Sequence, residues 1–174
     1  MKLYLTRHTS VDVPKSICYG QTDVPLKDSF ESEADIVKQR LNKIQADAVF
    51  SSPLSRCVRL ALHCGYEDAK LYDRLKELNF GDWEMQEWEK VEGNDEWFKD
   101  WVNTPTKNGE SFKQMYDRLA SFFEELKKED YDNVIIFAHG GIIACAKVYF
   151  GEVGFEDAFK TLANYGETVE FELK

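Results

Sequence analysis

Short apolar runs along this chain have the pattern of strands. Three of them, at residues 3–6, 48–50 and 134–138, are predicted to be buried, and a weaker one lies around 70–72. The run Val-Ile-Ile-Phe-Ala at 134–138 is continuously apolar, as expected of a strand at the centre of a parallel sheet. Residues 168–173 alternate between apolar and polar, which predicts a half-exposed strand at an edge.

Apolar residues spaced three and four apart predict helices between these strands. A first helix is expected to begin at a capping box made by Asp28 and Glu31. Its apolar stripe comprises Phe30, Ala34, Val37, Leu41 and Ile44. A second helix is expected between Pro53, which suits a first turn, and Gly65. Its inward face would hold Leu54, Val58, Ala61 and Leu62.

The clearest helical pattern follows the turn at Asn108-Gly109. Ser111 and Gln114 have the spacing of a capping box at its start. The stripe behind them consists of Phe112, Met115, Leu119, Phe122 and Leu126. A further helix is expected to open at Gly140, directly after the central strand.

Strands that alternate with helices predict an α/β protein. We expect a three-layer sandwich, in which a mostly parallel central sheet carries helices on both faces. No repeat or convincing boundary interrupts residues 1–174, so a single domain is expected. The tryptophan-rich stretch at about 80–104 has no clear period and predicts an excursion or lid over one end of the sheet, or else a solvated helical insertion.

Charge and composition narrow the possible partners. The chain of 174 residues has 22 Lys and Arg against 32 Asp and Glu, a net charge of −10, which suits neither nucleic acid nor an anionic membrane. No apolar run is long enough to span a bilayer, and charged residues come too early for a signal peptide. A cytoplasmic protein is expected, with its four scattered cysteines as reduced thiols.

Basic and imidazole side chains follow three of the predicted strands. Arg7 and His8 follow the first strand, Arg56 lies one turn beyond the second, and His139 with Gly140 follows the central one. Because ligands of open α/β sheets bind at the carboxyl ends of the strands, these groups are expected to converge. Each alone has an ordinary explanation, since such a histidine more often packs or caps and such an arginine is usually solvated.

The convergence indicates a bound anion. A guanidinium group presents a planar fork of donors that matches phosphate oxygens, and glycines at a helix start let backbone N–H groups approach an anion. An imidazole is also a competent nucleophile, and phosphoryl transfer through it needs a proton donor. Glu77, Glu84 and Glu110 are all candidate donors on spacing alone. His63, on a predicted helix surface, has no such basic or imidazole neighbours and is expected to have a structural role.

Five ordered segments resemble the motifs of the histidine phosphatase superfamily, which includes the cofactor-dependent phosphoglycerate mutases. They are Arg7-His8-Thr9, Ser52-Pro53-Leu54-Ser55-Arg56, Glu77 through Glu84, Gly109-Glu110-Ser111 and His139-Gly140. The resemblance implies a phosphoglycerate mutase-like fold and an enzyme that uses neither metal nor cofactor. It implies that His8 is the phosphorylated nucleophile and Glu77 the general acid and then base. The implied phosphate clamp is Arg7, Arg56 and His139, with Gly140 beside them.

Departures from the family pattern point away from the mutases. Thr9 replaces the usual glycine, and Ala144 replaces a basic residue common after the second His-Gly. Pro14 stands where many members carry an asparagine that touches phosphate, which leaves that contact to Gly20, Gln21 or another group of the loop. None of these changes removes a catalytic member of the motif set.

Within the superfamily the chain is most similar to the bacterial α-ribazole phosphatases, which dephosphorylate α-ribazole 5′-phosphate during assembly of the cobalamin nucleotide loop. The similarity rests on residues 7–9, 18–26 and 81–85. The expected partner is therefore a small phosphorylated metabolite. The alternatives are a broad-specificity phosphatase or mutase that acts on another such metabolite, and a non-catalytic phosphate-binding protein.

Overall fold

A five-stranded sheet forms the middle of the molecule. The computed structural model of the chain describes residues 1–91 and 93–174. The strands, in the order in which they lie side by side, are β3 (Lys70–Leu71), β2 (Ala48–Ser51), β4 (Asn133–Ala138), β1 (Lys2–Arg7) and β5 (Thr168–Glu172). All pairings are parallel except that of β5, which runs antiparallel to β1. The predicted central strand is confirmed, and so is the edge position of the last strand.

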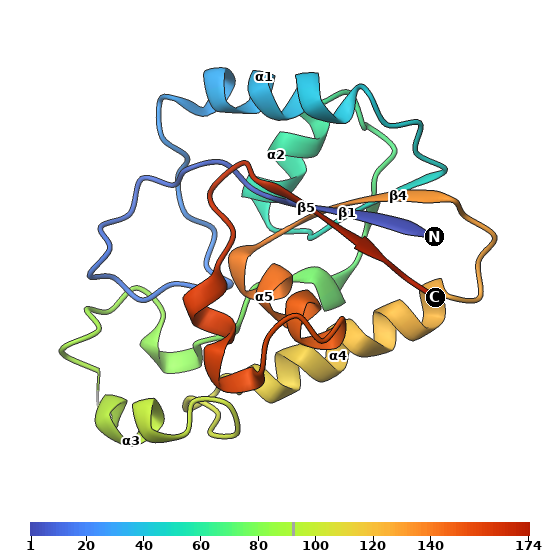
Figure 1. The fold of residues 1–174 in the computed structure, drawn as a ribbon. Coiled ribbons are helices and arrows are strands. Elements are labelled where there is room, and N and C mark those ends of the chain that lie inside the picture. The colour runs from blue at the N-terminus through green and yellow to red at the C-terminus, as the bar shows by residue number, and fades with distance from the viewer. Residues whose placement is uncertain (92) are drawn as a thin grey trace.

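Helices cover both faces of this sheet, which confirms the predicted three-layer sandwich (Figure 1). One face carries α1 (Phe30–Leu41) and α2 (Ser55–His63), and the other carries α4 (Phe112–Leu126) and α5 (Gly140–Tyr149). Successive side chains of β4 point to opposite faces of the sheet. Ile135 and Phe137 pack with α1 and α2, whereas Val134 and Ile136 pack with the opposite pair. A strand buried on both faces needs a continuous apolar run, as β4 has.

The tryptophan-rich stretch packs on the core. It contains a short turn of 3-10 helix (Gly81–Trp83) and the helix α3 (Asn94–Lys99), and its residue 92 lies outside the described residues. Trp83 and Trp97 are 7% and 4% exposed, and both contact the ring of Trp88. Such burial does not fit a solvated insertion. Within the described residues, no helix is long and apolar enough to cross a membrane.

Two local predictions about the helices are wrong. The first helix has Ser29 at its N-cap without a capping box, because the Glu33 carboxylate instead accepts hydrogen bonds from the Ser29 hydroxyl at 2.6 Å and the Ser10 N–H at 2.8 Å. In α2, Leu62 is 49% exposed. The buried face of α2 instead consists of Arg56, Cys57, Leu60 and Ala61. The apolar pattern could not predict this face, because one of its members is an arginine. The capping box at Ser111 is confirmed.

The central position of β4 makes a stability prediction. Ile136→Ala is expected to lower the free energy of unfolding by about 2–5 kcal/mol, because it leaves a cavity in a fully buried layer. Ile36→Ala is the matched control, since the Ile36 side chain on α1 is 59% exposed, and we expect a change within about 0.5 kcal/mol. Urea denaturation of both variants measures the difference, and similar losses would contradict the described burial.

Candidate active site

The two predicted histidines meet at the carboxyl ends of β1 and β4. These strands are neighbours, and their register pairs Arg7 with Ala138, so the residues that follow each strand lie side by side. The ring centroids of His8 and His139 are 5.2 Å apart. Arg56 enters the same region from the first turn of α2 and is fully buried. The expected convergence is therefore present.

A hydrogen bond sets the tautomer of His8. Its Nδ1 lies 2.8 Å from the carbonyl oxygen of Thr9, and because a carbonyl can only accept, Nδ1 must carry the proton. The lone pair of the neutral ring is then on Nε2. Burial, followed by the positive charges of Arg56 and Arg7, holds the pKa of His8 well below its usual range, although the bond to Thr9 works the other way. Within the described part of the chain, the structure thus presents a neutral imidazole whose Nε2 has no hydrogen-bond partner.

His139 is likewise buried and neutral. Its Nε2 lies 2.7 Å from the hydroxyl oxygen of Ser52, the residue directly after β2, for which no separate role was predicted. Burial is the main cause that holds the pKa of His139 well below its usual range, and the charge of Arg56 and the His8 ring add to it. His63 lies apart from this pair and contacts Asp35 at 2.7 Å, so it has the structural role expected.

Two arginines bring positive charge that the described residues do not neutralise. Arg56 donates to the carbonyl oxygens of Gly20 and Thr22, and Arg7 donates to that of Ala163. Within the described part of the chain, the buried Nε of each guanidinium group has no hydrogen-bond partner. Unpaired buried donors are costly unless a ligand completes them, and a phosphate oxygen suits this geometry. The pair therefore has the character of an anion site.

Glu77 is the acid that the structure brings to this site. Its carboxylate accepts hydrogen bonds from the N–H groups of Leu78 at 3.0 Å and of Gly141, at the start of α5, at 3.1 Å. A Cβ atom at position 141 would lie 2.2 Å from the Glu77 Oε1, so only glycine leaves room for this contact. The second glycine of the His-Gly-Gly segment therefore serves the placement of the acid.

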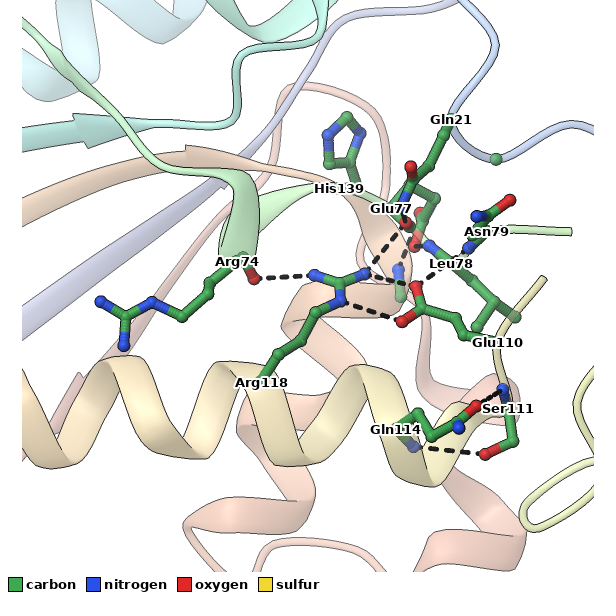
Figure 2. Close-up of polar contacts among 12 residues, drawn as sticks. Gln21, Arg74, Glu77, Leu78, Asn79, Glu110, Ser111, Gln114, Arg118 and His139 are labelled. Atoms are coloured by element: carbon green, nitrogen blue, oxygen red, sulfur yellow. Dashed lines mark hydrogen bonds and ion pairs between the residues drawn. The ribbon is translucent and has the colours of Figure 1, made fainter. Parts of the chain in front are cut away.

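The other two candidate acids are committed elsewhere. The Glu84 carboxylate accepts from the backbone N–H groups of four residues, Gly20, Gln21, Thr22 and Phe80. Burial raises the pKa of Glu84, but these hydrogen bonds outweigh it and leave the pKa below its ordinary value. Glu110 forms an ion pair with Arg118 (Figure 2). The geometry thus selects Glu77, where spacing left three acids open.

Gly20 and Gln21 occupy different positions from those predicted. Their N–H groups are bonded to Glu84 and are not free for a phosphate. The Gly20 carbonyl instead holds Arg56, and the Gln21 side chain donates to the carbonyl oxygen of Glu77 at 3.0 Å. Gly20 therefore helps to hold Arg56, and Gln21 helps to hold the backbone at Glu77. The family pattern placed this loop at the site, but it did not show that the backbone N–H groups of the loop point to Glu84.

A cavity of about 420 Å³ opens beside Arg7, His8 and Glu77. Its other walls are mostly apolar and aromatic: Tyr19, Leu78, Phe80, Trp88, Trp97, Phe98, Phe159 and Leu162. Phe98, Phe159 and Leu162 carried no signal in the sequence, because they lie in or directly after short helical segments that are too brief to show an apolar period. Among the described residues, no group of three or more His, Cys, Asp or Glu is placed to hold a metal ion.

Known proteins share both this sequence pattern and this fold. The family model described as histidine phosphatase superfamily, branch 1, matches residues 3–174. The adenosylcobalamin/α-ribazole phosphatase of Escherichia coli K12 is 28% identical over 154 residues, which make up 83% of this chain and 76% of that protein. Phosphoserine phosphatase 1 of Hydrogenobacter thermophilus is 31% identical over 147 residues, 78% of this chain and 69% of that protein.

A solved structure agrees with the architecture. The crystal structure of the α-ribazole phosphatase from Shigella flexneri matches with a TM-score of 0.87 over 99% of this chain and 90% of that one. The sequence identity is 23%, so the match shows a shared fold.

The hydrogen bond to Thr9 and the lowered pKa values make a spectroscopic prediction. Imidazole ¹⁵N spectra at pH 6.5, the ordinary pKa of histidine, are expected to show His8 and His139 as neutral rings. His8 should carry its proton on Nδ1. The variants His8→Asn and His139→Asn assign the resonances. A cationic ring at this pH, or a proton on the Nε2 of His8, would contradict the geometry.

Proposed function

The chain belongs to the histidine phosphatase superfamily, and we propose that it hydrolyses a small phosphomonoester through a phosphohistidine formed on His8. The observation that carries this proposal is the neutral His8, whose Nε2 is free beside two arginines with unpaired buried donors. A nucleophile of this kind needs positive charge around the phosphoryl oxygens and an acid for the leaving group. Arg7 and Arg56 would supply the positive charge, the neutral His139 would complete the clamp as a hydrogen-bond donor, and Glu77 would be the acid.

The proposed reaction has two steps. In the first, the Nε2 of His8 attacks phosphorus, the bond to the ester oxygen breaks, and Glu77 gives its proton to that oxygen. In the second, a water molecule attacks the phosphorus of phospho-His8 while Glu77 takes a proton from the water. The nitrogen–phosphorus bond then breaks, and inorganic phosphate leaves with His8 and Glu77 restored.

The cavity walls support a substrate with a flat apolar body. Six Tyr, Phe and Trp side chains line the cavity, and rings of this kind stack on a heteroaromatic base. We therefore propose α-ribazole 5′-phosphate, a benzimidazole nucleotide, as the substrate and cobalamin nucleotide-loop assembly as the pathway. The similarity to the Escherichia coli adenosylcobalamin/α-ribazole phosphatase supports the same choice.

Another phosphatase or mutase activity is the second candidate. The similarity to a phosphoserine phosphatase favours phosphoserine as the competing substrate. Against it stands the cavity lining, in which Arg7 is the only basic side chain among the described residues. If Arg7 binds phosphate, the carboxylate of phosphoserine has no cationic partner there. A non-catalytic phosphate-binding protein would have no use for Glu77 in this position.

The reaction is proposed to need no metal ion or cofactor and to take place in the cytoplasm. Guanidinium groups beside both histidines would repel a cation. All four cysteines are buried and free, which suits a reducing compartment.

Trapping of the phosphoenzyme tests the chemistry. Rapid quenching after mixing with a ³²P-labelled phosphomonoester is expected to yield acid-labile, base-stable phosphohistidine, and EDTA should not prevent turnover. His8→Asn should abolish the label and reduce turnover at least about a thousandfold, because no other group can accept the phosphoryl group. His63→Asn is the matched control and should keep both, because the His63 imidazole pairs with Asp35 and packs against Phe30 in the described part of the chain. Label that persists without His8 would overturn the mechanism.

A substrate panel tests the choice of ester. The value of kcat/KM for α-ribazole 5′-phosphate is expected to exceed that for phosphoserine and p-nitrophenyl phosphate by at least about tenfold. Phe98→Ala is expected to lower the α-ribazole value about threefold to tenfold, which corresponds to about 0.5–1.5 kcal/mol of aromatic contact, and to leave phosphoserine unchanged. The Phe98 side chain is 57% exposed, so its loss should not disturb folding. Equal values for all three esters would refute the substrate and leave the reaction class standing.

A further inference from the structure

An ion pair that the proposed reaction does not use lies beside the segment that carries Glu77 (Figure 2). Arg118 of α4 donates from Nε to Oε2 of Glu110 at 3.1 Å and from Nη2 to Oε1 at 2.7 Å. The two side chains are 19% and 17% exposed. A bidentate pair of this kind, largely shielded from water, holds a defined geometry.

The remaining bonds of this pair go to the backbone around Glu77. Arg118 donates to the carbonyl oxygens of Arg74 at 2.7 Å and of Glu77 at 3.0 Å. Glu110 accepts from the N–H group of Asn79 at 3.0 Å. Backbone groups before, at and after Glu77 are therefore tied to one cluster, as Figure 2 shows.

The segment needs such anchors because it has little regular structure of its own. It runs between two short 3-10 turns, Asp73–Leu75 and Gly81–Trp83. The helix α4 is rigid by comparison, since it begins at a capping box and buries Met115 and Leu119 on either side of Arg118 in sequence. Arg118 thus connects a fixed helix to an irregular segment.

We propose that Arg118, held by Glu110, positions the Glu77 carboxylate for proton transfer. This inference rests on the proposed role of Glu77 as the general acid. The carboxylate is bonded to the N–H groups of Leu78 and Gly141, so a shift of the backbone at Glu77 changes both contacts. Lysine could not replace Arg118, because a single ammonium group lacks the planar fork that reaches these acceptors together.

A positioning role for the acid has a signature that general destabilisation lacks. Protonation of the leaving oxygen matters greatly for phenyl phosphate but little for p-nitrophenyl phosphate, which has nearly the same shape and a much better leaving group. The value of kcat/KM covers the step in which the leaving group departs. A misplaced acid should therefore slow phenyl phosphate selectively, while inorganic phosphate still binds to the arginines and His139.

The experiment compares three variants with a matched control. Arg118→Met is expected to lower kcat/KM for phenyl phosphate about 10–100-fold, as loss of an orienting residue typically does, and that for p-nitrophenyl phosphate less than about threefold. Arg118→Lys and Glu110→Gln should also lower the ratio of kcat/KM for phenyl phosphate to that for p-nitrophenyl phosphate. These two variants test the proposal if Arg118→Met does not fold. Arg74→Met is the control, because within the described residues its side chain pairs with Glu125 and Ser121 and lies over the rings of Tyr72 and Phe122, away from Glu77 (Figure 2). This variant should leave the ratio unchanged.

Hydrogen exchange of the Gly141 amide provides a readout that does not depend on turnover. Its N–H donates to Glu77, so exchange should quicken in Arg118→Met and Glu110→Gln but not in Arg74→Met. A wild-type protein inactive on both esters and on α-ribazole 5′-phosphate would refute the proposed function, and the exchange data would still decide the positioning of Glu77. Equal losses on both esters, unchanged exchange in the Arg118 variants, or the same effects from Arg74→Met would overturn the inference.

Discussion

The active site depends on holding the fully buried Arg56 and the partly buried Arg7 next to two imidazoles, while no carboxylate among the described residues forms an ion pair with either guanidinium group. Charges of one sign at short range repel, and burial strengthens the repulsion. The fold offsets this with backbone carbonyls, those of Gly20 and Thr22 for Arg56 and that of Ala163 for Arg7. Carbonyls hold the cations in place without cancelling their charge. An incoming phosphate therefore meets donors that are fixed and still unpaired.

The loop that holds Arg56 is in turn held by further hydrogen bonds. The loop that holds Arg56 is itself fixed, because the Glu84 carboxylate collects the N–H groups of Gly20, Gln21 and Thr22. A Cβ atom on Gly20 would lie 1.7 Å from the Leu78 carbonyl oxygen, so this loop packs directly on the segment of the acid. Glu84 thus supports the loop that holds Arg56 without pairing with the guanidinium group itself. Its negative charge therefore does not compete with the substrate phosphate.

The sequence predicted the framework of the site better than its inner contacts. Strand ends and the following helices could be placed from hydrophobic periodicity, which brought His8, Arg56 and His139 to one edge. Glu77 could not be separated from Glu84 and Glu110, because their roles depend on which N–H groups each carboxylate faces. Leu62 was misplaced for a related reason, since the burial of Arg56 rotates α2 in a way that apolar spacing cannot show. The aromatic walls of the cavity include residues of short helical segments, such as Phe98 and Phe159, that are too brief to show an apolar period.

The short outer strands of the sheet also affect how the protein behaves among its own copies. The strands that the histidines follow, β1 and β4, lie inside the sheet, where β4 can be apolar from Val134 to Ala138 without exposing an unpaired edge. At one border β3 is only two residues long, and at the other β5 carries the exposed Glu170 and Glu172. Short or charged borders are poor templates for further strand pairing. The same order of strands that assembles the site therefore guards the chain against aggregation.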